Sequence, residues 1–172
     1  MTIATSRTLL VPYTEQLQHD FIKLNCCPVN RSEMNGPHSI ASAKFLFQEI
    51  LQDNVGFCRA IIHNQTREYL GHVFISSEEG RHELGFILDK EYWNRGFASE
   101  VLKPFLSLVC FEERLTNVVA TVNVGHNPSI KLLEKLGFEF KETKQDSFGP
   151  YHEYSYNAHC DVIFYEAVAR TA

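Results

Sequence analysis

The spacing of apolar positions along the chain predicts short strands that alternate with amphipathic helices. Thr8–Val11 is a β-rich run that ends at Pro12, and after Thr14 apolar residues recur at helical spacing. A strand followed by a helix is therefore predicted. Residues 25–37 have the proline, glycine and asparagine content of a loop, and Ser39 is placed to cap a second helix with one broad apolar face.

Three β-rich runs follow the second predicted helix. Gly56–His63 and Tyr69–Ser76 are separated by a short polar stretch, which is typical of an antiparallel hairpin. In the third run, His82–Leu88, period-two alternation sets side chains on opposite faces. One face carries Leu84, Phe86 and Leu88, and the other carries Glu83, Gly85 and Ile87.

Beyond the third run, the pattern predicts strands in alternation with helices. Gly96–Glu112 has the apolar periodicity of a helix, which Pro104 should kink. Asn117–Val124 is β-branched and largely apolar, as expected for a central strand that is covered on both faces. Asn127-Pro128 has the form of a cap followed by the first residue of a helix, which Gly137 should end.

The C-terminal part predicts two further strands, Phe138–Lys141 and Val162–Ala169. Between them, Glu142–His159 is polar and aromatic, and it is expected to form a long loop of the kind that is often functional. Residues 1–172 together are expected to form a single domain, because domains of roughly 50 to 250 residues are usual.

Composition and charge narrow the class of protein. A hydrophobic share of 44% is usual for a globular chain, and a net charge of −5 lacks the basic excess of a nucleic-acid-binding protein. No apolar run approaches the roughly 20 residues of a membrane span, and the first residues lack the pattern of a secretion signal. A cytoplasmic protein that binds neither nucleic acid nor membrane is therefore expected.

The cysteines and histidines suggest no metal or disulfide. The five cysteines have no CxxC spacing, so neither a disulfide framework nor a zinc site is predicted. Cys26 and Cys27 are interpreted as incidental loop thiols, with a catalytic role as the alternative. No pair of histidines has metal-ligand spacing with an acidic partner, so no metal is expected.

The most informative segment leads from the strand His82–Leu88 into the next helix. A helix start presents backbone N–H groups without internal partners and a partial positive charge, so a pyrophosphate fits there. Gly96 and Ala98 keep the approach open, and Arg95 can add a charge-assisted contact. A tight turn without a ligand is the alternative interpretation of Gly96. The chain has neither a P-loop nor a GxGxxG motif.

Three segments in this order resemble the GNAT acetyltransferase superfamily, in its RimJ/RimL branch of ribosomal-protein N-acetyltransferases. They are Glu83–Asp89 (ELGFILD), Tyr92–Glu100 (YWNRGFASE) and Asn127–Phe138 (NPSIKLLEKLGF). Thr8–Pro12 resembles the first strand of that branch and Asp161–Glu166 its last strand. The resemblance therefore covers nearly the whole chain.

The resemblance implies an α/β fold, with a mixed and mostly antiparallel sheet, a central parallel strand pair that splays apart, and about four flanking helices. It implies acetyl-CoA as cosubstrate, whose pantetheine enters the gap and pairs with the backbone near Ile87 and Leu88. Asn127 and Ser129 match positions that contact the cofactor, and a helix cap is the alternative role of Asn127. The pyrophosphate would be held by Asn94, Arg95, Gly96, Phe97, Ala98 and Ser99.

Two residues are expected to carry the chemistry. A neutral amine must attack the thioester, and the departing thiolate needs a proton. Glu83 matches the glutamate suggested as base in the RimL-like branch, beside Gly85, where an acceptor could approach closely; a solvated strand-edge carboxylate is the alternative. The tyrosine that many members use as acid is absent from Gly137–Phe140, which leaves the hydroxyl of Ser129. Trp93 is interpreted as a packing residue.

Acetyl transfer to an amine is therefore the expected function. The acceptor would be a peptide N-terminus or a small amine, and the protein a monomer or homodimer. One alternative is a catalytically silent acyl-CoA-binding module that regulates a partner. A weaker one is a general nucleotide-binding domain, which a preference for acetyl-CoA over NAD or ATP would exclude. The segments expected to shape the acceptor site, residues 25–37 and 142–159, are the least patterned parts of the chain.

Overall fold

The described strands form one mixed sheet. The computed structural model describes residues 2–52 and 56–158. The strand order is β1-β2-β3-β4-β5-β6-β8-β7, and all neighbours are antiparallel except β5 and β6. The strands are β1 (Ile3–Ala4), β2 (Thr8–Val11), β3 (Phe57–His63), β4 (Tyr69–Glu78), β5 (Arg81–Leu88), β6 (Asn117–Asn123), β7 (Glu139–Asp146) and β8 (Gly149–Asn157).

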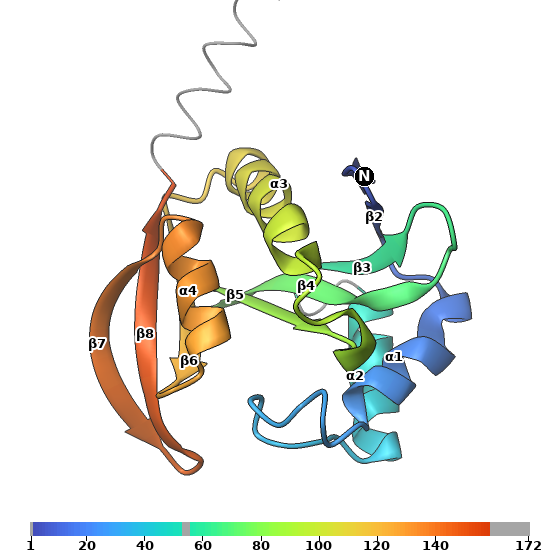
Figure 1. Cartoon of the computed structure of the whole chain (residues 1–172), viewed down its shortest axis with the longest axis horizontal. Coiled ribbons are helices and arrows are strands. Elements are labelled where there is room, and N and C mark those ends of the chain that lie inside the picture. Colours follow the sequence, from blue (N-terminus) through green and yellow to red (C-terminus); the bar gives the residue numbers. More distant parts are fainter. Residues whose placement is uncertain (1, 53–55, 159–172) are drawn as a thin grey trace, which may run out of the picture.

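Helices cover both faces of this sheet (Figure 1). Helices α3 and α4 close the larger core, in which Phe105 of α3 and Leu133 of α4 are buried. On the other face, α1 and α2 bury a smaller aromatic cluster around Phe21 and Phe47. The helices are α1 (Gln18–Asn25), α2 (Ile40–Leu51), α3 (Phe97–Glu112) and α4 (Asn127–Lys135), with short 3₁₀ turns η1 (Glu15–Leu17) and η2 (Lys90–Tyr92).

The parallel strands β5 and β6 are joined at one end only. A single register pair, Glu83 with Val119, links them, whereas β4 and β5 pair continuously along their length. Beyond this pair, no described strand pairs with the β6-facing edge of β5, so its backbone N–H and C=O groups need other partners. Figure 1 shows β6, β8 and β7 turning away from β5. The expected central splayed pair and α/β fold are confirmed.

Most predicted elements are also confirmed, with differences at the helix starts. The hydroxyl of Ser39 accepts a hydrogen bond from Ser42 N at 3.1 Å and caps α2 as predicted. Thr14 instead precedes the turn η1 without a side-chain cap, and α1 begins only at Gln18. Helix α3 continues past Pro104, which lies inside it.

The prediction of a long loop over Glu142–His159 is wrong. Strands β7 and β8 form an antiparallel hairpin that spans Glu139–Asp146 and Gly149–Asn157. Strand β7 lies at the edge of the sheet with nearly all of its side chains exposed, so it carries no alternation of apolar and polar residues. The predicted strand Val162–Ala169, and the resemblance of Asp161–Glu166 to a last strand, lie outside the described residues.

Two further features concern the described ranges alone. None of their helices combines the length and apolar character that a membrane span requires. Within the same ranges, His, Cys, Asp and Glu side chains do not gather in groups of three or more that could ligate a metal.

Candidate functional site

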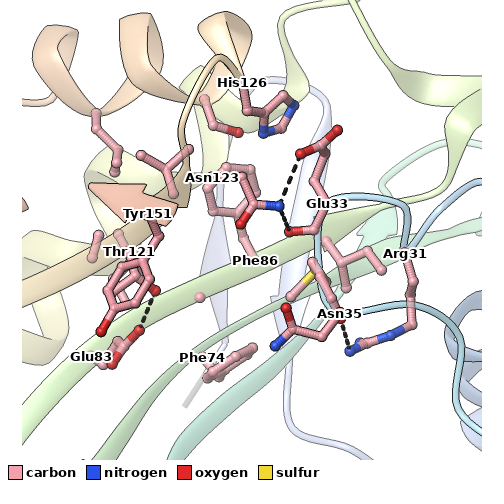
Figure 2. Close-up of a pocket in the computed structure, with 18 of the residues that line it drawn as sticks. Arg31, Glu33, Asn35, Phe74, Glu83, Phe86, Thr121, Asn123, His126 and Tyr151 are labelled. Carbon is pink, nitrogen blue, oxygen red and sulfur yellow. Dashed lines mark hydrogen bonds between the residues drawn. The ribbon is translucent and has the colours of Figure 1, made fainter. Parts of the chain in front are cut away.

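A cavity of about 670 Å³ opens where β5 and β6 diverge. Glu83 and Ser129 line it together, as do Ile87 and Leu88. Strands β4, β5 and β6, the start of α4, the tip of the β7–β8 hairpin and the loop between α1 and α2 all contribute to its walls. Figure 2 shows side chains from these separate elements facing one space. Further lining residues are Arg31, Glu33, Asn35, Phe74, Arg81, Phe86, Trp93, Thr121, Asn123, His126, Asp146 and Tyr151.

The open edge of β5 presents alternate backbone groups to the gap. Asp89 N donates to Leu70 O at 2.8 Å, which makes this a hydrogen-bonded pair of the antiparallel ladder. The continuous register with β4 then directs the polar groups of Ile87 to β4, and those of Phe86 and Leu88 to the gap. The backbone groups of β5 that face the gap are therefore those of Phe86 and Leu88, and Ile87 lines the cavity.

The gap-facing carbonyl of Leu88 already has a partner. Trp93 Nε1 donates to Leu88 O at 2.8 Å, and Trp93, which is 41% exposed, lines the cavity. A role in packing alone was expected for this residue. No local pattern indicates this contact, because it depends on how η2 returns the chain to the end of β5.

The turn into α3 has the form expected of a phosphate site. Asn94 and Gly96 adopt left-handed φ angles of 57° and 80°, and Gly96 caps the helix without a side chain. The first helical hydrogen bond runs from Glu100 N to Gly96 O at 3.2 Å, so the N–H groups of residues 97–99 have no acceptor within the helix. These groups and the helix dipole can bind an anion. The turn adjoins the cavity through Trp93 without lining it.

The N-terminal segment holds the first turn of α3. Glu100 accepts hydrogen bonds from Thr5 Oγ1 at 2.5 Å, and from Arg7 N and Nε at 2.7 Å each. Burial raises the pKa of Glu100, but these donors outweigh it and leave the pKa below its usual value. Arg7 also donates to the Arg95 carbonyl at 3.0 Å, and its guanidinium lies 4.2 Å from the centre of the Phe97 ring.

Arg95 and Asn127, expected to contact the cofactor, are exposed at two helix starts. Arg95 Nη1 lies 3.4 Å from Glu91 O, a long hydrogen bond that leaves the guanidinium at the surface. Asn127 is the first residue of α4, whose cap is His126, and no side-chain cap hydrogen bond forms there. The predicted cap is therefore one residue off, and the Asn127 side chain does not cap the helix.

Glu83 belongs to a polar network that crosses four strands. Its Oε1 accepts from Thr121 Oγ1 at 2.7 Å, and its Oε2 lies 3.3 Å from Arg81 Nη2. Arg81 also reaches Glu153 of β8 at 2.9 Å, and Lys144 of β7 contacts the same Glu153 oxygen at 3.0 Å. Burial raises the pKa of Glu153, but the two cations outweigh it and lower that pKa. The Glu83 side chain is still 32% exposed and can accept a further hydrogen bond.

Gly85 lines the cavity, and the Phe74 ring occupies the side of Gly85 on which a Cβ would lie. A Cβ on Gly85 would overlap the Phe74 ring and lie 2.6 Å from its Cε2. Phe74 lines the cavity from β4, and behind the strand it packs against the cluster of Phe21 and Phe47. An aromatic ring therefore bounds the cavity beside Glu83. The sequence did not show this, because Phe74 and Gly85 meet only through strand register.

Ser129 shares the cavity with His126 and Tyr151. Ser129 is half-buried in the first turn of α4, and no hydrogen bond of its hydroxyl is recorded within the described part of the chain. His126 precedes it, and Tyr151 of β8 enters from the hairpin that had been predicted as a loop. Tyr151 thus brings a phenol to the cavity, although residues 136–140, directly after α4, contain no tyrosine.

The loop between α1 and α2 bridges the two diverging strands. The Asn30 side chain donates to Asp89 Oδ2 at 3.1 Å and accepts from Lys90 N at 2.9 Å, just beyond β5. On the other side, Asn123 of β6 donates to Glu33 O at 3.2 Å and to Glu33 Oε2 at 3.1 Å. Figure 2 shows this Asn123–Glu33 contact at the cavity. The least patterned part of the sequence therefore forms a defined wall.

Comparison with known proteins agrees with this geometry. Residues 7–139 match the family described as acetyltransferase (GNAT) domain. This match covers most of the chain, which therefore belongs to the GNAT acetyltransferase family.

Curated relatives match shorter segments. The chain is similar to an uncharacterized N-acetyltransferase, p20, from Bacillus licheniformis, with 35% identity over 83 residues that cover 46% of this chain and 47% of p20. It is also similar to the L-amino acid N-acetyltransferase AaaT of Escherichia coli (strain K12), with 26% identity over 103 residues, covering 57% and 63% of the two chains. The chain thus spans about half the length of the first of these relatives.

Solved structures share the fold over nearly the whole chain. A GNAT-family acetyltransferase from Bacillus anthracis has a TM-score of 0.80 at 17% identity, covering 92% of this chain and 99% of that one. Spermidine N-acetyltransferase from Vibrio cholerae, in complex with CoA and spermine, has a TM-score of 0.79 at 15% identity, covering 91% and 99%. RimL with coenzyme A has a TM-score of 0.77 at 14% identity, covering 94% and 99%. This likeness confirms the fold.

Proposed function

We propose that this protein transfers an acetyl group from acetyl-CoA to a primary amine by direct attack in a ternary complex. The observation that carries the proposal is the gap between β5 and β6, which joins a row of open backbone groups to a cavity lined by Glu83 and Ser129. The pantetheine arm would pair with the backbone of Phe86 and Leu88. Its pyrophosphate would lie at residues 94–99, where helix N–H groups are open.

In this reaction, Glu83 and Ser129 would each take part in one proton transfer. Glu83 would take a proton from the acceptor ammonium, directly or through a water molecule, and the neutral nitrogen would then attack the thioester carbon. The carbon–sulfur bond breaks as the amide forms, and the thiolate receives a proton from the Ser129 hydroxyl or through a water that it orients. The proton that the nitrogen loses on becoming an amide would restore that donor. Asn127, exposed beside Ser129 at the start of α4, would contact the cofactor.

The acceptor class follows from what several relatives share. Their names specify ribosomal protein L7/L12, spermidine and L-amino acids as acceptors. All of these carry a primary amine, so we propose a primary amine acceptor here, either a peptide N-terminus or a small molecule. A monomer or homodimer in the cytoplasm stays our expectation.

A silent acyl-CoA-binding module is the second candidate, and one observation favours it. Both oxygens of Glu83 already have partners, Thr121 and Arg81, so the carboxylate is tied in place without an acceptor. Such a module would bind acetyl-CoA through the same gap and release no thiol.

An acceptor screen with parallel binding measurements tests the proposal. Calorimetry would compare acetyl-CoA, NAD and ATP, while thiol release would be followed with peptides that have free N-termini, amino acids and polyamines. Tight binding of acetyl-CoA and amine-dependent thiol release are expected. Binding without release across the whole panel would favour the silent module. Failure to bind acetyl-CoA would overturn both.

A further inference from the structure

Trp93 braces the turn between the two halves of the proposed cofactor site. Its indole Nε1 donates to Leu88 O, the last residue of β5, and its own amide donates to Lys90 O at 3.3 Å. The next residue, Asn94, begins the left-handed turn that leads to Gly96 and α3. The opposite side of the same turn is held by Asn30. The end of β5 and the start of α3 are therefore fixed relative to each other.

The same hydrogen bond limits where a ligand can pair with β5. The Leu88 carbonyl faces the gap and already accepts from the indole, so one of its two lone pairs is left for an amide N–H of an extended ligand. Such a ligand can pair at Phe86 and at Leu88 N–H, and it leaves the strand where the indole occupies one side of Leu88 O. The Trp93 ring, exposed to the cavity, stands at that exit.

We infer that Trp93 is a positioning residue that sets the spacing between the arm of the cofactor on β5 and its phosphates at α3. This inference rests on the proposed function, because it requires acetyl-CoA in the gap. A ligand with two linked halves binds far more tightly than either half only when both sites lie at the distance that the linker spans. Loss of the brace should therefore weaken the intact cofactor while leaving each half unaffected.

The test compares acetyl-CoA with its two parts in the full-length protein. S-acetylpantetheine represents the arm, and adenosine 3′-phosphate 5′-diphosphate represents the nucleotide with both phosphates of the pyrophosphate. The variant Trp93→Phe keeps an aromatic ring and loses the N–H donor. The matched control is Tyr92→Phe, which removes a polar group from the neighbouring ring outside the cavity lining. Dissociation constants would be measured by calorimetry, or by competition for the weak halves.

Trp93→Phe should bind acetyl-CoA about tenfold more weakly than the parent and bind each half within about twofold of it. Tyr92→Phe should match the parent throughout. Parental affinity for acetyl-CoA in Trp93→Phe would overturn the inference, as would an equal loss for one isolated half, which indicates a direct contact instead. A parent that binds no acetyl-CoA would overturn the proposed function itself.

A measurement on the parent keeps the inference testable if the variant does not fold. Trp93 is the single tryptophan of the chain, so one indole N–H resonance and all tryptophan emission report on this position. Acetyl-CoA should change the emission saturably, and the indole N–H should stay protected from exchange in the complex. An unchanged emission, or an indole N–H that exchanges freely when acetyl-CoA is bound, would overturn the inference.

Discussion

Glu83 is the residue whose surroundings bear most directly on catalysis. Thr121 and Arg81 fix its carboxylate, and the side chain keeps contact with solvent and the cavity. Glu83→Gln preserves the hydrogen-bonding shape and removes the base. Turnover should fall roughly 100-fold to 10,000-fold, and acetyl-CoA affinity should change little. A higher pH should partly rescue the variant, because more of the acceptor amine is then neutral.

A pH–rate profile on one identified acceptor measures this effect. Glu78→Gln, in an exposed position of the neighbouring strand β4, is the matched control and should behave as the parent. If Glu83→Gln turned over at the parental rate throughout the pH range, Glu83 would be an orienting or surface residue.

Gly85 is predicted to be required because of Phe74, not because a ligand crosses it. A methyl group at residue 85 would overlap the Phe74 ring, which is held from behind by the α1–α2 cluster. Gly85→Ala should therefore destabilise the fold by about 1–3 kcal/mol. Phe74→Leu makes room, so the double variant should lose less stability than the sum of the two single variants. Urea unfolding of the parent, the two single variants and the double variant measures these losses of stability. Strictly additive losses would contradict the contact between residue 85 and the Phe74 ring.

At the scale of elements, the first turn of α3 is the proposed binding site for the pyrophosphate, and this proposal can be tested by substitution. Gly96→Asp places a carboxylate beside backbone N–H groups that have no acceptor within helix α3. Repulsion between this carboxylate and the pyrophosphate should weaken acetyl-CoA binding by about tenfold or more. Gly80→Asp is the matched control, because Gly80 has the same φ of 80° in a hairpin turn away from the site. Calorimetry on the two folded variants measures their affinities for acetyl-CoA. Equal affinities in Gly96→Asp and Gly80→Asp would show that the pyrophosphate binds elsewhere.

Elements with a strong local period were predictable from the sequence, and those without one were not. Strand β5 and helix α3 carry clear apolar patterns, and both elements lie where the sequence predicts them. Only the start of strand β7 was predicted, as part of Phe138–Lys141, because an exposed edge strand needs no apolar face, and strand β8 was missed. Tyr151 was missed with it, since a phenol in a presumed loop cannot be assigned to a cavity.

The candidate site was harder to predict than the fold, because it is assembled from contacts distant in sequence. Glu83 and Ser129 were expected from a resemblance, and the structure brings them to one cavity. Phe74, Trp93 and Asn123 enter it through strand register, a returning turn and a bridging loop. A sequence pattern cannot indicate any of these three contacts, because none of them repeats at a fixed spacing along the chain.

At the scale of the whole molecule, the sheet separates two cores of different character. The larger core under α3 and α4 is aliphatic and aromatic, whereas the smaller core under α1 and α2 encloses polar groups. Tyr13 and Tyr69 hydroxyls lie 2.7 Å apart, and Tyr13 lies 3.1 Å from His72 Nδ1. The His72 ring stacks on Phe21 at 5.3 Å. This smaller core supports Phe74, so its stability bears on the shape of the cavity.

His72 should make the fold sensitive to mild acid. Burial, followed by the nearby charges of Arg31 and His38, lowers the pKa of His72 to about 3. A histidine in the unfolded chain has a pKa of about 6.5. Protons therefore bind the unfolded chain first, and the free energy of unfolding should fall as the pH drops below about 6.5, by up to about 1.4 kcal/mol per pH unit from this residue.

Urea unfolding between pH 8 and 5 should show this dependence of stability on pH in the parent and a shallower slope in His72→Gln. The exposed His19→Gln control should keep the parental slope. Should His72→Gln prove too unstable to measure, NMR of the folded parent should show no titration of the His72 ring across that range; a ring that protonates near pH 6.5 while the protein stays folded would contradict its burial as a neutral group.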